Sequence, residues 1–373
     1  MDSSVIILPD GRACPGCAFG LDLGPVLAAL VEAGELLDAE ASFPAEALAA
    51  LAGAGALAAP VPPDLGGPGL GTAECGTQGI FELLSALGHA NLSLGRVFEA
   101  HVNALRLIWK YGAAPQIERA FAQAREGHLF GLWITDRSDA PVRLKSGILE
   151  GQKAFVSSVG VASRALITFD ASDQGERMAV IDLVANQVET VANFDLHGVR
   201  SAATARVDLS GVRVAEEDIV GVPGDYMRDP ELSLGAWRAL AVMHGGLVAL
   251  VEALGAALLL RGRDGDPHQR ARLGQALVAQ ETATLWIRRC AALAEADHAG
   301  EPAANYVKLA RIAVERACVE VMNLAQRSVG VAAMVRPNTI ERLCRDLNTY
   351  LRQPALDMVL DEAAAFFIRG KMP

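Results

Sequence analysis

The stretch that decides the fold reads Gly131-Leu-Trp-Ile-Thr-Asp136 and, after a connecting segment, Gly151-Gln-Lys-Ala-Phe-Val-Ser-Ser158. From about Leu129 onward the apolar residues occur in short runs rich in β-branched and aromatic side chains, which is typical of strands. Residues 205–209 alternate between apolar and polar side chains, as a half-buried strand does. Helical spacing dominates before this segment and returns after about Asp225, so we predict a β-rich segment between two helical ones.

Working outward from the β segment divides the chain into four parts. Residues 1–20 lack periodicity and are expected to form an irregular arm, and residues 21–128 are expected to form a helical domain. The β domain is predicted over residues 129–228 and a C-terminal helical bundle over residues 229–373. The fold class is therefore α+β, mainly α. Strands flanked by helical blocks do not suit repeating β-α-β units, which disfavours a doubly wound nucleotide-binding sheet.

Composition narrows the class of protein. Hydrophobic residues make up 51% of the 373-residue chain and charged residues 21%, which indicates a packed globule rather than a disordered chain. The 33 basic and 44 acidic residues give a net charge of −11, so neither nucleic acid nor an anionic membrane is an expected partner. No secretory signal pattern is visible at the start. The longest apolar stretch, residues 247–260, contains Glu252 and is too short for a membrane span. We therefore expect a core helix there, no membrane insertion and a cytoplasmic protein.

The cysteines and glycines predict no metal or phosphate site. Of the 6 cysteines, only Cys14 and Cys17 form a close pair. Structural zinc needs four ligands, and no second pair or histidine cluster accompanies this one, so we expect reduced thiols and no bound metal. The glycine-rich residues 64–71 lack the Gly-Lys-Ser/Thr ending of a phosphate-binding loop.

Several stretches resemble the acyl-CoA dehydrogenase superfamily of flavoproteins. Residues 131–136 are similar to the family's strand ending in Thr-Glu, and residues 151–158 to its Gly-x-Lys-x-(Trp/Phe)-(Ile/Val)-(Ser/Thr) segment. Three further matches follow in the family's order: His197-Gly-Val-Arg-Ser201, Gln326-Arg-Ser-Val-Gly330 and Glu341-Arg-Leu-Cys-Arg-Asp346. Each motif alone is weak, but their order and spacing together indicate the family over about residues 21–351.

The resemblance implies a three-domain subunit with a barrel-like or orthogonally packed β domain and a C-terminal four-helix bundle. FAD would lie between these two domains. Backbone and hydroxyl groups of Trp133, Ile134 and Thr135 would line the isoalloxazine ring, where hydrogen bonds to ring nitrogens tune its reduction potential. Phe155 would pack on the other side of the flavin, and Ser157 would bond near its reactive nitrogen.

The adenosine diphosphate part of FAD would be held with help from a neighbouring subunit. The matching positions are Arg261 or Arg263, together with Gln326 and Gly330. An arginine suits a pyrophosphate because its planar fork pairs two oxygens at once. Ser138 would stand in for the family's pyrophosphate-binding serine, in a segment that looks shorter than in many relatives. The resemblance also implies a homodimer or homotetramer.

Structural alternatives stay open for these residues. Trp133, Ile134 and Phe155 would also suit an apolar core. A Ser-Ser pair after a strand usually forms hydrogen bonds within a turn. An arginine at position 261 would complement the dipole at the C-terminus of a helix.

The usual catalytic base of the family is missing. Its carboxylate takes a proton α to a thioester carbonyl while the flavin accepts a hydride from the β carbon. The usual position, nine residues after Arg345, holds Pro354, and the position that a minority of members use holds Trp237. Neither side chain can take a proton.

Three replacements come into question as the base. Asp357 lies roughly one helical turn beyond Pro354, although it would equally suit the first turn of a helix. His101 lies on the helix that faces the active-site cavity in the family and titrates near neutrality, but a lone histidine on an apolar helix is often structural. His244 is a weaker third candidate.

We therefore predict an FAD-dependent oxidoreductase that acts on the Cα–Cβ bond of an acyl thioester or a related small molecule, with or without a CoA carrier. Two alternatives remain. The first is a flavin-dependent monooxygenase or oxidase on the same fold, whose relatives lack the glutamate because they activate oxygen. The second is a catalytically silent subunit of a heteromeric flavoprotein.

Overall fold

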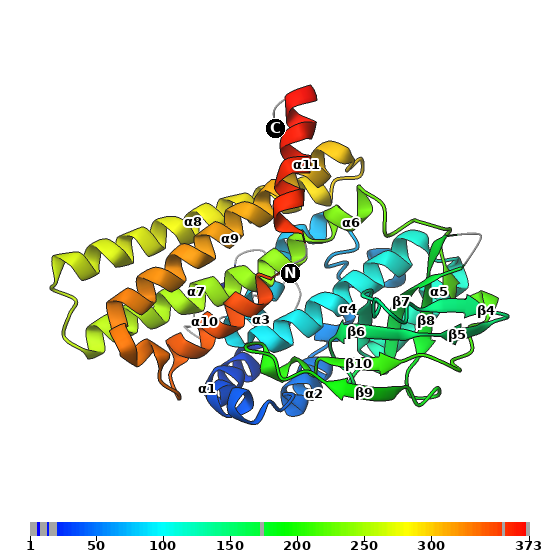
Figure 1. The fold of residues 1–373 in the computed structure, drawn as a ribbon, viewed down its shortest axis with the longest axis horizontal. Helices are drawn as coiled ribbons and strands as arrows, with labels where there is room; N and C mark the ends of the chain where they lie inside the picture. Colours follow the sequence, from blue (N-terminus) through cyan, green and yellow to red (C-terminus); the bar gives the residue numbers. More distant parts are fainter. Residues whose placement is uncertain (1–5, 8–12, 15–20, 172–174, 353–354, 371–373) are drawn as a thin grey trace.

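The computed structural model describes residues 6–7, 13–14, 21–171, 175–352 and 355–370. Helices fill one end of the molecule and the strands lie at the other, with α3 and α4 running between them (Figure 1). Within residues 1–20, which we predicted as an irregular arm, β1 (Ile6–Ile7) and β2 (Ala13–Cys14) form a short antiparallel pair. Cys17 and the side chain of Cys14 lie outside the described part of the chain.

The N-terminal part is helical, as the sequence indicates. Its helices are α1 (Gly24–Glu40), α2 (Ala45–Gly53), α3 (Thr77–Ala90), α4 (Leu92–Tyr111) and α5 (Ala114–Arg125). Helix α4 begins at Asn91, whose side chain accepts a hydrogen bond from the Leu94 amide at 2.9 Å and so satisfies one free donor of the first turn.

The middle of the chain forms two sheets. The larger has the order β11-β8-β7-β4-β5, with β3 paired to β7 in parallel, and the smaller has the order β6-β10-β9. Strand β10 shows the predicted alternation of buried and half-buried residues. The strand bounds are β3 (Phe130–Trp133), β4 (Arg143–Lys145), β5 (Ile148–Glu150), β6 (Gln152–Val156), β7 (Arg164–Asp170), β8 (Glu176–Asp182), β9 (Glu189–Asn193), β10 (Ala205–Asp208) and β11 (Ile219–Val220).

The C-terminal part is again helical. It comprises α6 (Glu231–Leu234), α7 (Trp237–Leu260), α8 (Pro267–Ala294), α9 (Glu301–Val329), α10 (Thr339–Tyr350) and α11 (Leu356–Arg369). Helices α7 to α10 pack together, and α11 stands against α9 at the edge (Figure 1). The segment Glu231–Leu260 is apolar and long enough to cross a membrane by those measures alone. However, 56% of its most apolar window is buried inside the fold, so it is a core helix, as predicted.

Close backbone contact joins the N-terminal and C-terminal helices. A Cβ atom at Gly88 of α3 would lie 2.1 Å from the Val242 carbonyl oxygen of α7, and one at Gly245 would lie 2.0 Å from the Ser85 carbonyl oxygen. Because both distances are far inside van der Waals contact, only glycine allows the two helices to approach so closely. This packing brings α4, the next helix, alongside α7.

Arg345 and Asp346 join α10 to α1 and to the segment around Val199. Both residues belong to the segment that is similar to the family's Arg-Asp motif. The Arg345 guanidinium donates to both carboxylate oxygens of Asp38, at 3.0 and 2.5 Å, which ties α10 to α1. The carboxylate of Asp346 accepts a hydrogen bond from the Val199 amide at 2.6 Å. These buried, charge-assisted contacts place α10 between the N-terminal helices and the β domain.

Candidate active site

A polar stripe runs along one face of α4. Arg96, Glu99, Asn103, Arg106 and Lys110 recur at spacings of three and four residues, so their side chains leave the helix on the same side. The first four are half-buried and Lys110 is exposed, whereas much of the rest of the helix is buried. We call these five residues the α4 stripe.

The N-terminal end of the stripe meets the β domain at Ser157. The Nε of Arg96 donates a hydrogen bond to Ser157 Oγ at 3.0 Å, and Thr204 Oγ1 lies 3.3 Å from the same oxygen. The Arg96 guanidinium also lies over the ring of Tyr350, 5.4 Å from its centroid. Residues of α4, the end of β6 and the end of α10 therefore converge at this point.

One helical turn further along α4, Glu99 belongs to a second group of polar side chains. Asn103 donates its amide hydrogen to Glu99 Oε1, and Asn103 Oδ1 accepts a hydrogen bond from Arg238 Nη1 at 3.0 Å. Burial raises the pKa of Glu99 to about 7, against the opposing effect of the Arg96 and Arg238 charges. Glu99 is thus poised to change its charge near neutral pH.

Two phenols share the surroundings of Glu99. Burial, followed by the negative charge of Glu99, raises the pKa of Tyr226 and of Tyr350 above the ordinary tyrosine value. Both phenols are therefore neutral hydrogen-bonding groups at physiological pH. The site around Glu99 consequently combines a titrating carboxyl, two guanidinium groups and two neutral phenols.

The other carboxylates near the stripe are held by cations. Glu231 pairs with Arg106 at 2.9 Å and with Lys110, and these charges lower its pKa despite its burial. Glu295 pairs with Arg106 at 3.1 Å and with Arg238, and it also accepts the indole hydrogen of Trp237 at 2.7 Å. Trp237, at the family's less common base position, is therefore a buried partner of Glu295.

The residues predicted to line the flavin ring lie where β3 and β6 end. The Trp133 indole is 2% exposed and donates to the Ser157 carbonyl at 3.0 Å, so its side chain belongs to the core, as the structural alternative anticipated. The Ile134 carbonyl accepts hydrogen bonds from the buried Lys153 ammonium at 2.7 Å and from Thr168 Oγ1 at 3.1 Å. Thr135 is exposed.

Phe155 presents an aromatic face to the surface. Its side chain is 56% exposed and its φ is +55°, a conformation that a bulky residue rarely adopts. The ring stacks on Phe194 with centroids 4.5 Å apart and the planes inclined by 12°. The Arg206 guanidinium lies over Phe194, and its Nε is buried without a hydrogen-bond partner among the described residues. An exposed ring beside such a donor is suited to a flat, polar ligand.

The residues predicted to hold adenosine diphosphate gather mainly at the opposite end of the molecule. Arg261 donates to the Val329 carbonyl at 2.8 Å, directly before Gly330, which ends α9 with a φ of +75°. Arg263 pairs with Asp266 at 3.5 Å, and Gln326 is half-buried one turn before Gly330. This end lies far from β6 (Figure 1).

Ser138, the predicted substitute for the pyrophosphate-binding serine, is not part of that group. It is exposed in the turn between β3 and β4 of the β domain. The predicted cofactor contacts therefore fall into two sets. One lies at the ends of β3 and β6 and in the turn that follows β3, and the other lies where α7 and α9 end.

The two candidate bases, Asp357 and His101, do not join the α4 stripe. His101 is fully buried: its Nδ1 accepts the Phe130 amide hydrogen at 3.1 Å and its Nε2 lies 2.9 Å from the Leu57 carbonyl, to which it donates. Burial lowers the pKa of His101 to about 4. Asp357 is exposed on the first turn of α11, where it suits the helix dipole. The geometry thus gives both residues structural places, and our expectation that His101 faces the site needs correction.

His244 is likewise part of the helix packing. Its Nδ1 lies 2.8 Å from Ser85 Oγ on α3, and its Nε2 lies 2.9 Å from Thr284 Oγ1 on α8. Burial lowers the pKa of His244 to about 4, so the neutral ring bridges three helices.

Sequence reasoning identified Ser157 but missed Glu99 and the other residues of the α4 stripe. Glu99 lies two residues before His101. The histidine was predicted as the base instead, because the histidine side chain titrates near neutrality in water. The available signal was the spacing of polar residues along an otherwise apolar helix, from Arg96 to Lys110.

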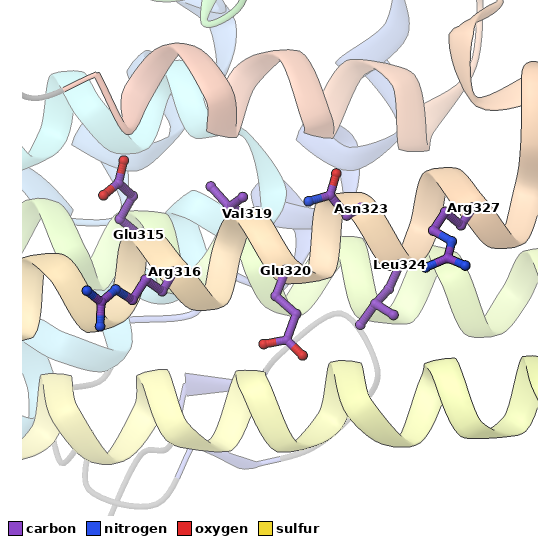
Figure 2. A pocket seen from close by; sticks show the side chains of 7 residues that line it. All are labelled: Glu315, Arg316, Val319, Glu320, Asn323, Leu324 and Arg327. Atoms are coloured by element: carbon purple, nitrogen blue, oxygen red, sulfur yellow. The ribbon is translucent and has the colours of Figure 1, made fainter.

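A groove of about 590 Å³ lies elsewhere, along the outer face of α9 (Figure 2). All of its lining residues come from that helix: Glu315, Arg316, Val319, Glu320, Asn323, Leu324 and Arg327. They share no residue with the α4 stripe. Among the residues that the structure describes, no group of three or more histidine, cysteine or acidic side chains could hold a metal ion.

Comparison with known proteins identifies the N-terminal domain and the overall fold. A family model described as "Acyl-CoA dehydrogenase, N-terminal domain" matches residues 27–128, which include α3, α4 and the α4 stripe. The structure as a whole matches a butyryl-CoA dehydrogenase from Megasphaera elsdenii with a TM-score of 0.80. Residues 27–128 thus resemble that domain, and the chain as a whole has the acyl-CoA dehydrogenase fold. A search of the curated proteins finds no match.

The solved structures that share this fold include both a dehydrogenase and a monooxygenase. The butyryl-CoA dehydrogenase is 16% identical, and the match covers 92% of this chain and 96% of that one. KijD3 in complex with FMN and a dTDP-linked amino-keto sugar has a TM-score of 0.78 and 22% identity, and the match covers 94% of both chains. The dibenzothiophene monooxygenase TdsC from Paenibacillus sp. A11-2 has a TM-score of 0.80 and 19% identity, with 94% of this chain and 97% of that one covered. Such identities establish the shared fold, so the reaction must be argued from the site.

Proposed function

We propose that this protein is a flavin-dependent oxidoreductase of the acyl-CoA dehydrogenase superfamily, whose flavin lies where β3 and β6 end, against α4. The observation that carries the proposal is the hydrogen bond from Arg96 to Ser157. It brings the α4 stripe to the point where Thr135, Phe155 and Ser157 are predicted to contact the isoalloxazine ring. A charged, proton-exchanging group of residues therefore adjoins the place predicted for the reactive edge of the cofactor.

The residues at this place fit a flavin. Phe155 offers an exposed aromatic face, and the unpartnered Nε of Arg206 lies beside Phe194, on which Phe155 stacks. The Ser157 hydroxyl and the backbone around Thr135 supply hydrogen-bonding groups, and Trp133 and Lys153 brace the two strand ends from behind. A bound flavin would supply hydride acceptance or oxygen activation. The chain's own part is to orient the ring, hold the substrate and move its proton.

The cofactor that we propose is FAD. Arg261, Arg263, Gln326 and Gly330 lie too far along the bundle to serve the flavin of their own subunit, which favours their presentation to the adenosine diphosphate of a neighbour. Exposed apolar side chains on α8, such as Leu277, Val278 and Leu285, support a homodimer or homotetramer. We also infer that the protein is cytoplasmic, which is supported by the burial in the core of the one described helix that is long and apolar enough to cross a membrane.

We propose a small-molecule substrate at the α4 stripe. An acyl thioester or related carbonyl compound oxidised at its Cα–Cβ bond is our leading reaction, with the base relocated from its usual positions. A flavin-dependent monooxygenase or oxidase is the second candidate. It is favoured by Trp237 at one of those positions and Pro354 at the other, because neither side chain can take a proton from a substrate.

Spectroscopy on the purified protein tests this function. A flavin absorbance spectrum is expected, and chromatography of the released cofactor should identify FAD; release of FMN would overturn the adenosine diphosphate assignment. If the protein is colourless and neither FAD nor FMN reconstitutes it, the proposed oxidoreductase function is wrong. The hypothesis of a catalytically silent subunit would then remain.

Substrate trials then separate the two reactions. Anaerobic mixing with a series of acyl-CoAs should bleach the flavin if the protein is a dehydrogenase. If no acyl-CoA bleaches it, but a reductase-coupled assay consumes oxygen and forms an oxygenated product, the monooxygenase is correct instead.

A further inference from the structure

We infer that Glu99 is the residue that takes a proton from the substrate, and that the substrate is a weak acid whose conjugate base lies against Arg96. This inference rests on the proposed flavin-dependent function. It assigns the base to α4, a helix different from those that carry the two usual positions of the family.

The position of Glu99 supports this assignment. It lies on the same face of α4 as Arg96 and one helical turn away, and Arg96 contacts Ser157, the predicted neighbour of the flavin's reactive nitrogen. Through the Asn103 amide, Glu99 is also connected to Arg238, the residue directly after Trp237. A carboxyl on α4 therefore adjoins the place at which some relatives carry theirs on α7.

Glu99 differs from the other carboxylates around the stripe in its partners. Glu231 and Glu295 are each held in salt bridges. Within the described residues no salt bridge joins Glu99, and its hydrogen-bond donor is the neutral amide of Asn103. A carboxylate that is already neutralised by a cation is a poor base, whereas a carboxylate with a neutral partner remains available for a proton.

Charged and titratable groups face Glu99 from each helix or segment around it. Arg96 comes from α4, Arg238 from α7, Tyr226 from the segment before α6, and Tyr350 from α10. Burial outweighs the two arginines and raises the pKa of Glu99 to about 7, which is the range in which a general base works best at neutral pH. Glu99 is also half-buried, so its side chain is not fully enclosed by the fold.

The proton transfer balances without a further reactant. The Glu99 carboxylate takes the proton of an O–H, N–H or carbonyl-activated C–H bond, and the electron pair of that bond stays on the substrate. The resulting anion is stabilised by the Arg96 guanidinium, with Arg238 beyond it. A substrate that lacks such an acidic hydrogen would gain nothing from this arrangement, so an unactivated hydrocarbon is excluded as the substrate class.

Infrared titration of the holoenzyme tests the protonation of Glu99 directly. The carbonyl-stretch band of a protonated carboxyl disappears on ionisation, and the difference between wild type and Glu99→Gln isolates the contribution of Glu99. We expect that contribution to titrate with a midpoint near the pKa of about 7. Glu118→Gln, which removes an exposed carboxyl on α5, is the matched control and should leave this component of the spectrum in place. A Glu99 component that titrates at the ordinary glutamate value would overturn the inference.

Kinetics then test the catalytic role with the substrate found in the trials above. Glu99→Gln should lower kcat roughly 100-fold or more and remove the acidic limb of the pH profile of kcat/KM. The conservative Glu99→Asp should restore part of the rate. Flavin binding should be unchanged in both variants, since neither removes a predicted flavin contact. An unaltered rate and profile in Glu99→Gln would overturn the inference.

The outcomes for the function and for Glu99 are separable. A colourless protein in which Glu99 titrates near neutrality would remove the proposed function but keep the unusual carboxyl. A yellow protein in which Glu99 titrates at the ordinary value would keep the function and remove only the role of Glu99.

Discussion

The Nε of Arg96 lies 3.0 Å from the Oγ of Ser157, which joins the middle of the helical region to the end of β6. Ser157 is buried and Arg96 is half-buried, and the Arg96 guanidinium also lies over the Tyr350 ring. The contact fixes the distance between the charged face of α4 and the strand ends at which the flavin is proposed to bind. The predictions below follow from this arrangement.

Replacing Arg96 with methionine should raise the pKa of Glu99 further. The positive charge of Arg96 favours the ionised carboxylate and opposes the effect of burial, so its removal leaves burial less opposed. Infrared titration should therefore show a higher midpoint for Glu99 than in the wild type. Arg119→Met, on the exposed surface of α5, should not move the midpoint. A lower midpoint in Arg96→Met would contradict the electrostatic arrangement.

The free energy of unfolding should depend on Glu99 between its unfolded pKa of 4.5 and its folded pKa of about 7. In this window the folded protein binds more protons at Glu99 than the unfolded chain does, so stability falls as pH rises. Relative to Glu99→Gln, the wild type should lose about 1–2 kcal/mol between about pH 5 and about pH 8, a figure reduced for partial solvent screening. Urea unfolding of both proteins at the two pH values measures this difference, and a loss of equal size in both would refute it.

His101→Ala should destabilise the fold by about 2–4 kcal/mol, because it leaves the Leu57 carbonyl and the Phe130 amide without partners and opens a cavity. The folded pKa of about 4 lies below the ordinary value of 6.5, so the unfolded chain binds more protons between these values. The wild type should therefore lose stability as pH falls through that window, and the variant should lose less. Thermal unfolding against pH provides the measurement, with the exposed His298→Ala as control. Intact stability in His101→Ala would show that the histidine is free for another role.

Asp357→Asn should leave flavin binding and turnover unchanged. The residue is exposed on α11, and its contribution is limited to the N-terminal charge of that helix, worth less than about 1 kcal/mol. Steady-state kinetics and urea unfolding of the variant check both statements. A large fall in kcat without loss of stability would restore Asp357 as a candidate base.

Phe155→Ala should weaken flavin binding roughly fivefold to tenfold while leaving the fold nearly as stable, because the ring is 56% exposed. Phe169→Ala in β7 is the matched contrast: that ring is 1% exposed, so its loss should cost about 3–5 kcal/mol. Flavin titration by fluorescence quenching and urea unfolding measure the two effects. Unchanged flavin affinity in Phe155→Ala would move the proposed cofactor away from this face.

Much of the fold was predictable because it depends on local periodicity. The strands around residues 130–134 and 205–209 and the long helix that ends near Leu260 are evident from which residues are apolar and at what spacing. The acyl-CoA dehydrogenase fold was predictable from short motifs in a fixed order. The Trp133 side chain lies in the core, as the structural alternative for this residue anticipated.

The candidate site was only partly predictable. Ser157 and Phe155 were identified through their motif, whereas Glu99 was passed over for His101, two residues away on the same helix. In isolation the histidine is the better base, because its ordinary pKa of 6.5 is nearer to neutrality than the 4.5 of glutamate. Burial moves the pKa of both residues, and it moves them in opposite directions, to about 4 and about 7.

The sequence by itself determined the order of helices and strands, the resemblance to the acyl-CoA dehydrogenases, and the lack of a proton-accepting side chain at the two usual positions of the base. Only the tertiary structure brings together the residues from which we propose a replacement. Glu99, Arg238 and Tyr350 come from helices that are distant in the chain, and their meeting depends on the packing of α4 against α7 and α10. The spacing of polar residues in the sequence shows which face of a helix is polar. The burial and the neighbouring charges that set the pKa values on that face come from the elements packed against it. The chemistry of the α4 stripe is therefore a property of the folded chain.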